Sequence, residues 1–547
     1  MKVALAQLNF VIGDFEGNAL KIIHHIGKAK SDGADIVIFS ELSVTGYYPH
    51  DLLEKNEFIR KAGETVIEIA KHCSGIAAIV GAPSINPNKC GKHLFNSVFF
   101  LNNGKIECIH NKTLLPAYDV FDEYRHFEPN RDFSVVEYKG EKIAVTIGED
   151  LFDEPLLDSG FAENKFYQIS PIEELIKHNP DFVINISASP FSHNHEGRRK
   201  NALISKAKKY KIPVLCVNQV GAHTELIFDG GSVFINKNGE TAKELNYFEE
   251  DYALVDTCNH GEINLQKSAC YIEKIHDALV LGIRDYFVKT GFKNATIGLS
   301  GGIDSAVTAV LAVRALGTAH VRALLMPSKY SSDHSLSDAI KLAENLKIKY
   351  DIVPIQSAVD AFEKEMAPLF AGLPPDVAEE NIQARARGIY LMTLSNKYGS
   401  ILLNTTNKSE CAVGYGTLYG DMNGGLAVLG DIYKTDVYKL SRFINRDVEI
   451  IPENSILKPP SAELKPNQKD TDSLPEYENL DQILLNYIEM NKSCEEIVVS
   501  GFEADIVKRV IRMVNISEYK RFQAAPILRV SSKAFGFGRK MPLDARF

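Results

Sequence analysis

The 547-residue sequence lacks the features that mark several specialised classes of protein. Basic residues are not in excess, since Lys and Arg number 61 against 71 Asp and Glu, for a formal net charge of −10. No apolar run approaches the ~18 residues that a membrane-spanning helix needs. We therefore expect no nucleic-acid partner and no membrane partner, because any anionic ligand must be held by a local cluster of charges.

Closely grouped cysteines are also missing. The eight cysteines are widely spaced and form no CxxC pair, which argues against a zinc site and against a small disulfide scaffold. The opening residues, MKVALAQLNF, reach Asn9 before an apolar signal core could form. We expect reduced thiols in a cytoplasmic protein with no targeting segment.

The length and composition indicate a globular chain with more than one core. Hydrophobic residues make up 45% and charged residues 24%, which is ordinary for a cored protein. At roughly 100–200 residues per domain, two large domains or three to four smaller ones are expected.

The pattern along the chain predicts two α/β domains, 1–260 and 261–547. Residues 1–260 contain short apolar strands such as KVALAQ and DFVINIS, separated by turns and helices, which indicates a layered α/β domain. From about residue 270, strands alternate with helices, which predicts a doubly wound, mostly parallel sheet. Residues 447–480 are rich in Pro, Lys, Asp and Ser, so a long irregular loop or lid is expected there.

A phosphate-binding loop is predicted after the apolar strand ATIGL. The sequence Ser300-Gly301-Gly302-Ile303-Asp304-Ser305 joins this strand to an alanine-rich helix. Two glycines bring bare N–H groups towards an anion, and the start of the helix adds partial positive charge. Asp304 is suited to a metal ion rather than to a phosphate. Taken alone, the segment could instead be a Gly-Gly turn followed by a helix cap, and the GxxxxGK[ST] loop of other nucleotide-binding proteins is absent.

SGGIDS resembles the pyrophosphatase-type loop (PP-loop) of ATP-dependent adenylating amidotransferases. Further motifs, MPSKYSS, LLNTTNKSE, GYGTLYGDMNGG and IYKTDVYKL, make nearly the whole chain similar to the glutamine-dependent NAD(+) synthetases. The resemblance implies a nitrilase-like four-layer α/β sandwich as glutaminase domain and a PP-loop synthetase domain. It implies an ATP-dependent amidation of deamido-NAD through an adenylated intermediate, with Mg²⁺ and with ammonia from glutamine, in a homo-oligomer.

The resemblance also implies roles for residues of the second half. ATP binding falls on Gly298, Leu299, Ser300, Gly301, Gly302, Ile303, Asp304, Ser305 and Thr405. Binding of deamido-NAD falls on Asn381, Arg385, Glu410, Lys434 and Lys520, and binding of Mg²⁺ on Asp304 and Glu410. Asn381 and Arg385 are four residues apart on one helix, so they share a face, which from the residues alone could also be a solvated polar face.

In the first half, the resemblance matches a glutaminase site that lacks one part. A nitrilase-type amidase uses a glutamate base, a lysine and a cysteine nucleophile. Glu41 and Lys112 match the first two, and Tyr118, Ser189 and His195 match the positions that bind glutamine. The family's cysteine falls on Gly148, in the sequence Gly148-Glu149-Asp150. Glycine cannot attack an amide, so glutamine use is in doubt, whether Gly148 is natural or engineered.

Two other functions stay open from the sequence. The chain could be another PP-loop adenylating amidotransferase, or a catalytically silent protein that keeps the scaffold for binding or regulation. The helix NIQARARG and the segment YKTDVYKL argue against the first, and the intact SGGIDS and Glu410 argue against the second.

Overall fold

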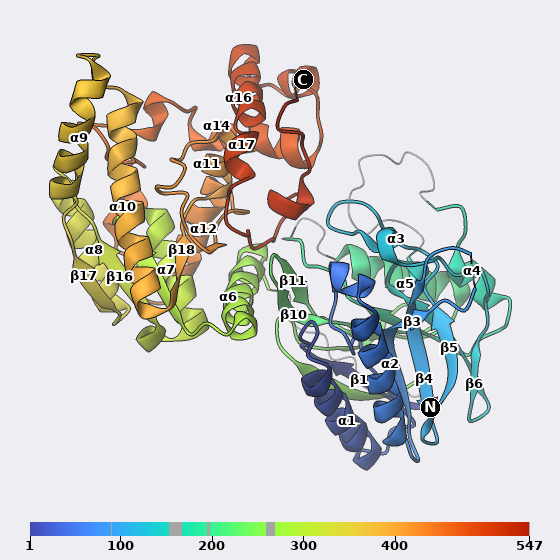
Figure 1. The fold of residues 1–547 in the computed structure, drawn as a ribbon. Helices are drawn as coiled ribbons and strands as arrows, with labels where there is room; N and C mark the ends of the chain where they lie inside the picture. Colours follow the sequence, from blue (N-terminus) through green and yellow to red (C-terminus); the bar gives the residue numbers. More distant parts are fainter. Residues whose placement is uncertain (89, 153–166, 194–196, 259–268, 546–547) are drawn as a thin grey trace. The chain divides into compact units, whose positions relative to one another are not determined.

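The computed structural model describes residues 1–88, 90–152, 167–193, 197–258 and 269–545 (Figure 1). Its contacts divide the chain into two compact units, Met1–Ser268 and Ala269–Phe547. The boundary predicted between residues 260 and 261 lies outside the described residues. Among the residues described, no helix is long and apolar enough to cross a membrane.

The first unit contains two six-stranded sheets and a short antiparallel pair. The first sheet has the order β14 (Asp251–Asp256), β1 (Lys2–Gln7), β2 (Ile36–Ile38), β3 (Ala77–Ile85), β4 (Leu94–Asn102), β5 (Lys105–Asn111). The second has the order β13 (Thr241–Glu244), β12 (Val233–Ile235), β9 (Val214–Asn218), β8 (Phe182–Ser187), β7 (Glu141–Ile147), β6 (Val136–Tyr138). The pair is β10 (Val220–His223) and β11 (Leu226–Asp229).

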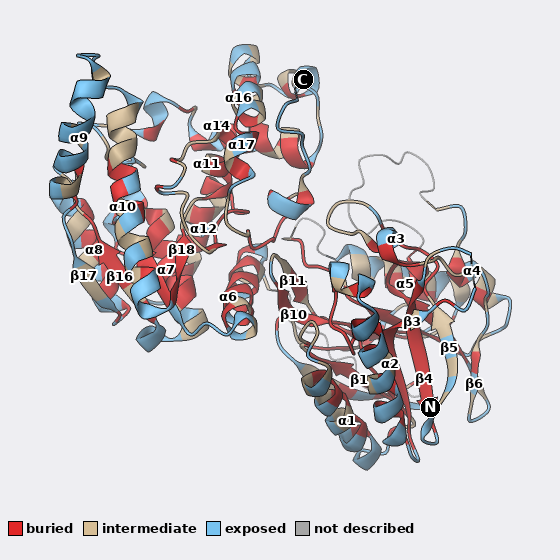
Figure 2. Ribbon diagram, in the orientation of Figure 1, coloured by how far each residue is buried: buried red, intermediate tan, exposed pale blue. Residues whose placement is uncertain are grey.

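The two sheets face each other, and helices cover their outer faces. Helices α1 (Phe15–Ser31) and α2 (Asn56–Lys71) pack on the first sheet, and α4 (Pro171–Ile176) and α5 (Arg198–Tyr210) on the second. Strand β1 shows how one strand contributes to two cores. Its Val3 and Leu5 point into the core between the sheets, whereas Ala4 and Ala6 point towards the helices. Both faces of the strand are buried (Figure 2). The predicted four-layer α/β sandwich is confirmed.

The second unit is built on one five-stranded parallel sheet. Its order is β17 (Lys349–Ile352), β16 (Val321–Leu325), β15 (Asn294–Gly298), β18 (Ser400–Asn404), β19 (Leu426–Ala427). The order reverses between β15 and β18, and open α/β sheets bind ligands at the carboxyl ends of strands at such a point. The phosphate loop follows β15, and Thr405 follows β18.

Helices cover both faces of this sheet, as a doubly wound fold requires. Helices α6 (Tyr271–Thr290), α7 (Ile303–Leu316) and α12 (Lys434–Ile444) pack together, with α8 (Asp333–Asn345) after β16. Helices α9 (Gln356–Phe370) and α10 (Val377–Tyr398) pack together, and α10 lies on β15 and β18. The C-terminal helices are α11 (Lys408–Val413), α13 (Glu453–Leu457), α14 (Tyr477–Leu484), α15 (Cys494–Val499), α16 (Ala504–Ile516) and α17 (Glu518–Arg521). The predicted doubly wound domain is confirmed.

The segment predicted to be a lid is only partly irregular. Helix α13 and a 3₁₀ turn at Asp470–Asp472 interrupt it, and α14 begins before residue 480. Between α13 and the turn the chain is irregular, and there Lys458 Nζ donates to Ser335 Oγ at 2.8 Å. Glu463 Oε1 accepts from the hydroxyls of Ser332 and Ser335 at 3.0 and 2.6 Å. This stretch is therefore docked on the start of α8.

A buried lysine joins three distant segments of the second unit. Lys408 is fully buried, and its Nζ lies 2.8 Å from Asp431 Oδ1 and 2.8 Å from Glu489 Oε1. It also donates to Ser531 Oγ at 2.7 Å. An ammonium group without water needs such partners. One charge therefore ties α11 to the loop before α12, to the helical turn Leu485–Glu489 and to the C-terminal segment.

We predict that Lys408→Met destabilises the chain by about 3–5 kcal/mol, because it leaves Asp431 and Glu489 as uncompensated buried charges. Denaturant-induced unfolding would measure the loss. The matched control is Lys439→Met, which removes a half-exposed lysine 2.7 Å from Asp436 and should cost less than about 1 kcal/mol. Equal losses for the two variants would show that the buried cluster is not special.

Candidate active sites

In the first unit, three chain segments bring a lysine and two glutamates together. Glu41 follows β2, Lys112 follows β5, and Glu123 begins α3 (Glu123–His126). Lys112 Nζ donates to Glu41 Oε1 at 2.7 Å and to Glu123 Oε1 at 2.9 Å. Asn96 Nδ2 also donates to Glu41 Oε1, at 2.7 Å, and Tyr47 Oη donates to Glu123. The structure thus brings Glu41 and Lys112 into contact, as expected for a paired base and cation.

Burial sets the charges of this cluster. Desolvation lowers the pKa of Lys112, but the carboxylates of Glu123 and Glu41 outweigh it, so the pKa lies above its ordinary value. Desolvation raises the pKa of Glu123 to about 7, and repulsion by Glu41 adds to it, while Lys112 opposes the shift. Two carboxylates therefore compete for one ammonium group.

Gly148 is buried next to this cluster. It follows β7 at the start of a 3₁₀ turn, η2 (Gly148–Leu151), with φ +51, in the left-handed region that favours glycine. A Cβ built on Gly148 would lie 2.9 Å from Lys112 Nζ and 3.2 Å from Glu41 Oε2. A side chain at position 148 would thus enter the Glu41–Lys112 pair directly, although the Lys112 amine would have to move by a few tenths of an ångström.

The predicted glutamine-binding residues are spread around Gly148. Tyr118 Oη donates to Glu149, the residue after Gly148, and so does Tyr167 Oη. The backbone N–H of Ser189 donates to Asn218 Oδ1 at 2.8 Å, next to Ala188, whose N–H donates to Glu41 Oε2. His195 lies outside the described residues.

In the second unit, the phosphate loop lines two adjoining cavities of about 260 and 150 Å³. Gly301 has φ +79, and a Cβ there would lie 2.1 Å from the Ser335 carbonyl oxygen, so only glycine fits. Ser300 Oγ accepts from the Gly302 N–H at 3.2 Å. Of the predicted ATP-binding residues, the larger cavity is lined by Gly298, Leu299, Ser300, Gly302 and Thr405, and the smaller by Ser300, Gly302, Ile303, Asp304, Ser305 and Thr405.

The smaller cavity contains a second buried lysine between two carboxylates. Lys434 Nζ lies 2.5 Å from Asp304 Oδ2 and 3.4 Å from Glu410 Oε1. Glu410 is fixed by α11, because its side chain and that of Asn407 form a capping box. Desolvation raises the pKa of Glu410 to about 8, opposed by Lys434 and reinforced by Asp304 and Asp470. Asp470 lines the same cavity, so three carboxylates surround one ammonium group.

Three predicted residues for deamido-NAD lie outside the linings of these two cavities. Asn381 Oδ1 accepts from Thr417 Oγ1 at 2.6 Å, and Arg385 Nε donates to the Leu418 carbonyl at 3.3 Å. Lys520 Nζ donates to the carbonyls of Gly414 and Gly416 at 2.7 and 2.8 Å. All three therefore contact the loop of residues 414–425, which agrees with Asn381 and Arg385 sharing a face of α10.

Several residues of these sites carry no signal in the sequence. Glu123 follows Lys112 by eleven residues, a spacing that indicates no shared role. Arg387, two residues after Arg385, lines the larger cavity and donates to the Met326 carbonyl at 3.1 Å. Asp470 lies in the segment 447–480, which the sequence predicts only as a lid. Its position in the same cavity as Glu410 depends on how residues 447–480 pack on the rest of the unit.

Each of the two units matches a known protein family. Residues 2–260 match the carbon-nitrogen hydrolase family, and residues 275–524 match the NAD synthase family. The glutamine-dependent NAD(+) synthetase of Synechocystis sp. is 45% identical over 554 residues, covering 100% of this chain and 99% of that protein. The glutamine-dependent NAD+ synthetase of Acinetobacter baumannii, solved in complex with ADP, is 37% identical with TM-score 0.78, covering 99% of this chain and 98% of that one.

The fold and sites define a two-part carbon–nitrogen ligase, with a nitrilase-type amidase unit joined to a PP-loop synthetase unit. Full-length similarity then gives the family: the chain belongs to the glutamine-dependent NAD(+) synthetases. Its enzyme class is NAD synthase, in a family that uses ATP. The two alternatives left open by the sequence, another PP-loop amidotransferase and a catalytically silent scaffold, are therefore not supported.

The raised pKa of Glu123 predicts that the stability of the folded chain depends on pH. The pKa of Glu123 rises from 4.5 to about 7 on folding. The folded state then binds more protons than the unfolded state between these pH values, so the stability from this group is present below pH 4.5 and is lost as pH rises through about 7.

Glu123→Gln should therefore weaken the decline in unfolding temperature between pH 5 and 8, measured by differential scanning calorimetry of the full chain. Glu128→Gln, which changes a half-buried glutamate five residues further along the chain, is the control and should keep the decline of the unmodified protein. An unchanged decline in Glu123→Gln would mean that Glu123 is already ionised at pH 5.

Proposed function

We propose that the second unit joins ammonia to deamido-NAD in two steps. The nicotinate carboxylate attacks the α-phosphate of ATP, forming an oxygen–phosphorus bond while the bond to the β-phosphate oxygen breaks and pyrophosphate leaves. Ammonia then attacks the carbonyl carbon of the mixed anhydride, AMP leaves, and the nitrogen loses a proton to give the amide of NAD. Both steps build up charge, so fixed charges and donors supply most of the catalysis.

One observation carries this proposal: the phosphate loop, Thr405, Asp304, Glu410 and Lys434 line a single cavity. The loop offers backbone N–H groups and hydroxyls at the start of α7, where an anion is favoured. Lys434 supplies positive charge at the same place. The adjoining cavity of about 260 Å³ is the proposed place for the rest of ATP.

The carboxylates suit a magnesium ion. Asp304 and Glu410 offer oxygen ligands, which Mg²⁺ prefers, and the excess of carboxylates over ammonium groups around Lys434 favours an added cation. We assign Mg²⁺ binding to Asp304 and Glu410. When bound, the ion would neutralise charge on the phosphates.

Deamido-NAD is assigned to the loop of residues 414–425 and its neighbours. Asn381, Arg385 and Lys520 all contact that loop. Tyr415 and Asp421 of the loop line the phosphate cavity together with Glu410 and Lys434. The docked stretch around Glu463 would exclude water from the adenylate, which water would otherwise hydrolyse. Cytoplasmic location and homo-oligomeric assembly stay predictions.

Ammonia is the nitrogen source that we propose for this chain as written. Glu41 as base and Lys112 as stabilising cation are in contact, and Tyr118, Ser189 and His195 are the proposed glutamine-binding residues. Hydrolysis of glutamine by this chemistry needs a thiolate at position 148, however, and Gly148 has no side chain. The first unit thus keeps two parts of a glutaminase and lacks the nucleophile.

Asp304→Asn tests the synthetase site. We expect pyrophosphate release with ATP and deamido-NAD to fall at least ~100-fold, because the change removes one charged oxygen ligand from the phosphate cavity. Asp333→Asn is the matched control, since Asp333 is an exposed acid in the first turn of α8 and should leave the rate unchanged. Equal rates in both variants would remove Asp304 from the site.

Gly148→Cys tests the nitrogen source. The unmodified chain should make NAD from ammonium but from glutamine at a rate several powers of ten lower, because no acyl-enzyme can form. Gly148→Cys should restore use of glutamine and leave the ammonium rate unchanged.

Gly148→Ala is the control for this test, because it adds the same Cβ at φ +51 without the sulfur, and it should stay inactive with glutamine. Efficient glutamine use by the unmodified chain would overturn the proposal. Failure of Gly148→Cys with a normal ammonium rate would mean that the glutamine pocket is also altered.

A further inference from the structure

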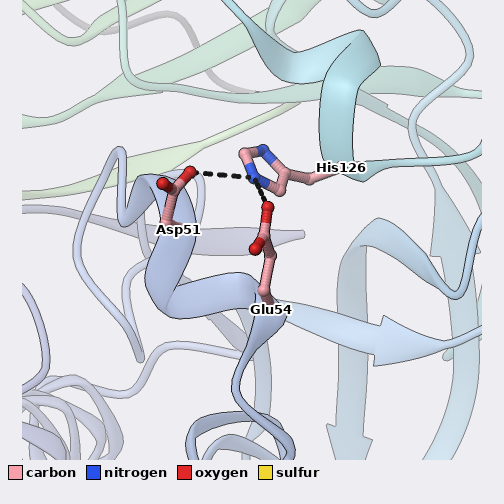
Figure 3. Close-up of side chains that lie close together, drawn as sticks. All are labelled: Asp51, Glu54 and His126. Carbon is pink, nitrogen blue, oxygen red and sulfur yellow. Dashed lines mark ion pairs between the residues drawn. The ribbon is translucent and has the colours of Figure 1, made fainter.

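Two acidic side chains on the first unit converge on a buried histidine that neither site uses (Figure 3). Asp51 and Glu54 lie on the 3₁₀ helix η1 (His50–Glu54), and His126 ends α3. His126 Nε2 lies 3.7 Å from Asp51 Oδ1 and 3.7 Å from Glu54 Oε1. The three atoms all lie within 4.8 Å of one another. This arrangement has the residue types and spacing of a metal site.

The histidine side chain is buried and aimed at the carboxylates. Only 4% of it is exposed, and its Nε2 has no hydrogen-bond partner within the described part of the chain. Its Nδ1 lies 2.7 Å from Tyr48 Oη, and that hydroxyl donates to the Asp122 carbonyl at 3.2 Å. A hydroxyl has one proton, so Nδ1–H is then the donor to Tyr48 and Nε2 carries the lone pair.

A bare nitrogen facing two carboxylates is repulsive unless a cation lies between them. Metal-bound histidines commonly donate their second ring N–H to a fixed partner, as His126 does to Tyr48. The tautomer is therefore the one that a metal ion needs.

The distances fit a transition-metal ion. Two donors that are each about 2.1 Å from an ion lie about 3.4 Å apart at a tetrahedral angle and about 3.6 Å apart at a trigonal one. The observed 3.7 Å from Nε2 to each oxygen needs only a small shift, and the two oxygens lie within 4.8 Å of each other on side chains that are 67% and 58% exposed. One imidazole with two carboxylates favours Zn²⁺ over Mg²⁺, which prefers oxygen alone.

Arg125 already neutralises part of this cluster. Its Nη2 lies 3.0 Å from Asp51 Oδ1 and 3.4 Å from Glu54 Oε1, the same two oxygens that face His126. The Arg125 side chain is half exposed, so it can turn away into water. A bound cation and the Arg125 guanidinium would therefore compete for the same carboxylates.

We propose that Asp51, Glu54 and His126 form a structural site for a divalent transition-metal ion of the Zn²⁺ class, oriented by Tyr48 and opposed by Arg125. The ion would connect η1 to α3. Helix α3 begins with Glu123, which contacts Lys112 in the buried cluster described above. Occupancy is expected to stabilise the first unit and to leave the ammonium-dependent reaction of the second unit unchanged.

The test is titration of the full chain with Zn²⁺ by calorimetry, together with the unfolding temperature. The double variant Asp51→Asn/Glu54→Gln changes two exposed side chains and should weaken binding at least ~100-fold, since loss of even an outer partner costs about 10–100-fold. It should also abolish the rise in unfolding temperature that Zn²⁺ causes. Glu57→Gln/Glu64→Gln, two exposed acids on α2, is the control and should bind like the unmodified chain.

Arg125→Gln should have the opposite effect to Asp51→Asn/Glu54→Gln, because it removes the guanidinium that competes with the metal ion for the carboxylates. Zn²⁺ should bind this variant more tightly than the unmodified chain. Ions held by cysteine thiols contribute equally to all variants and cancel in the comparison. The proposal is overturned if the unmodified chain takes up no Zn²⁺, if the Asp51→Asn/Glu54→Gln variant binds as the control does, or if Arg125→Gln fails to bind more tightly.

Discussion

A lysine ammonium group can stay charged away from water only when carboxylates surround it, and much of this structure follows from that requirement. Lys112, Lys408 and Lys434 are each at most 2% exposed, and each lies between two carboxylates. In every case at least one partner comes from a distant part of the sequence: Glu41 for Lys112, Glu489 for Lys408 and Asp304 for Lys434. Each lysine therefore fixes how several segments meet, and no segment can move without leaving a buried charge unpaired.

In the second unit, the buried cluster around Lys408 and the cavity-lining cluster around Lys434 are built on the same elements. Lys408 and Glu410 lie on α11, with Lys408 directed to the buried Asp431 and Glu410 to the phosphate cavity. Asp431 in turn lies three residues before Lys434, whose backbone N–H donates to Ser409 Oγ at 2.9 Å. The buried pair thus sets the positions of the side chains that face the cavity. Rigid placement of this kind is what charge stabilisation in a transition state needs.

The sequence was sufficient for the elements whose signal is local. Strand periodicity predicted both α/β domains, and SGGIDS after a strand predicted the loop that the structure places at the reversal of strand order. Local patterns could not predict Glu123, Asp470 or the Lys408 cluster, because their partners are brought together only by the fold. The prediction of an irregular loop over residues 447–480 holds for only part of the segment. The composition indicates a loop, but α13 and α14 form there because their apolar residues pack on the core.

The buried cluster of Glu41, Lys112 and Glu123 is complete without a side chain at position 148. Lys112 is satisfied by Glu41 and Glu123, and Glu41 by Asn96 and the Ala188 N–H, so none of these groups needs a sulfur atom as partner. Glycine at position 148 leaves none of these charges or donors unpaired. The geometry of Glu41 and Lys112 therefore does not depend on a side chain at position 148.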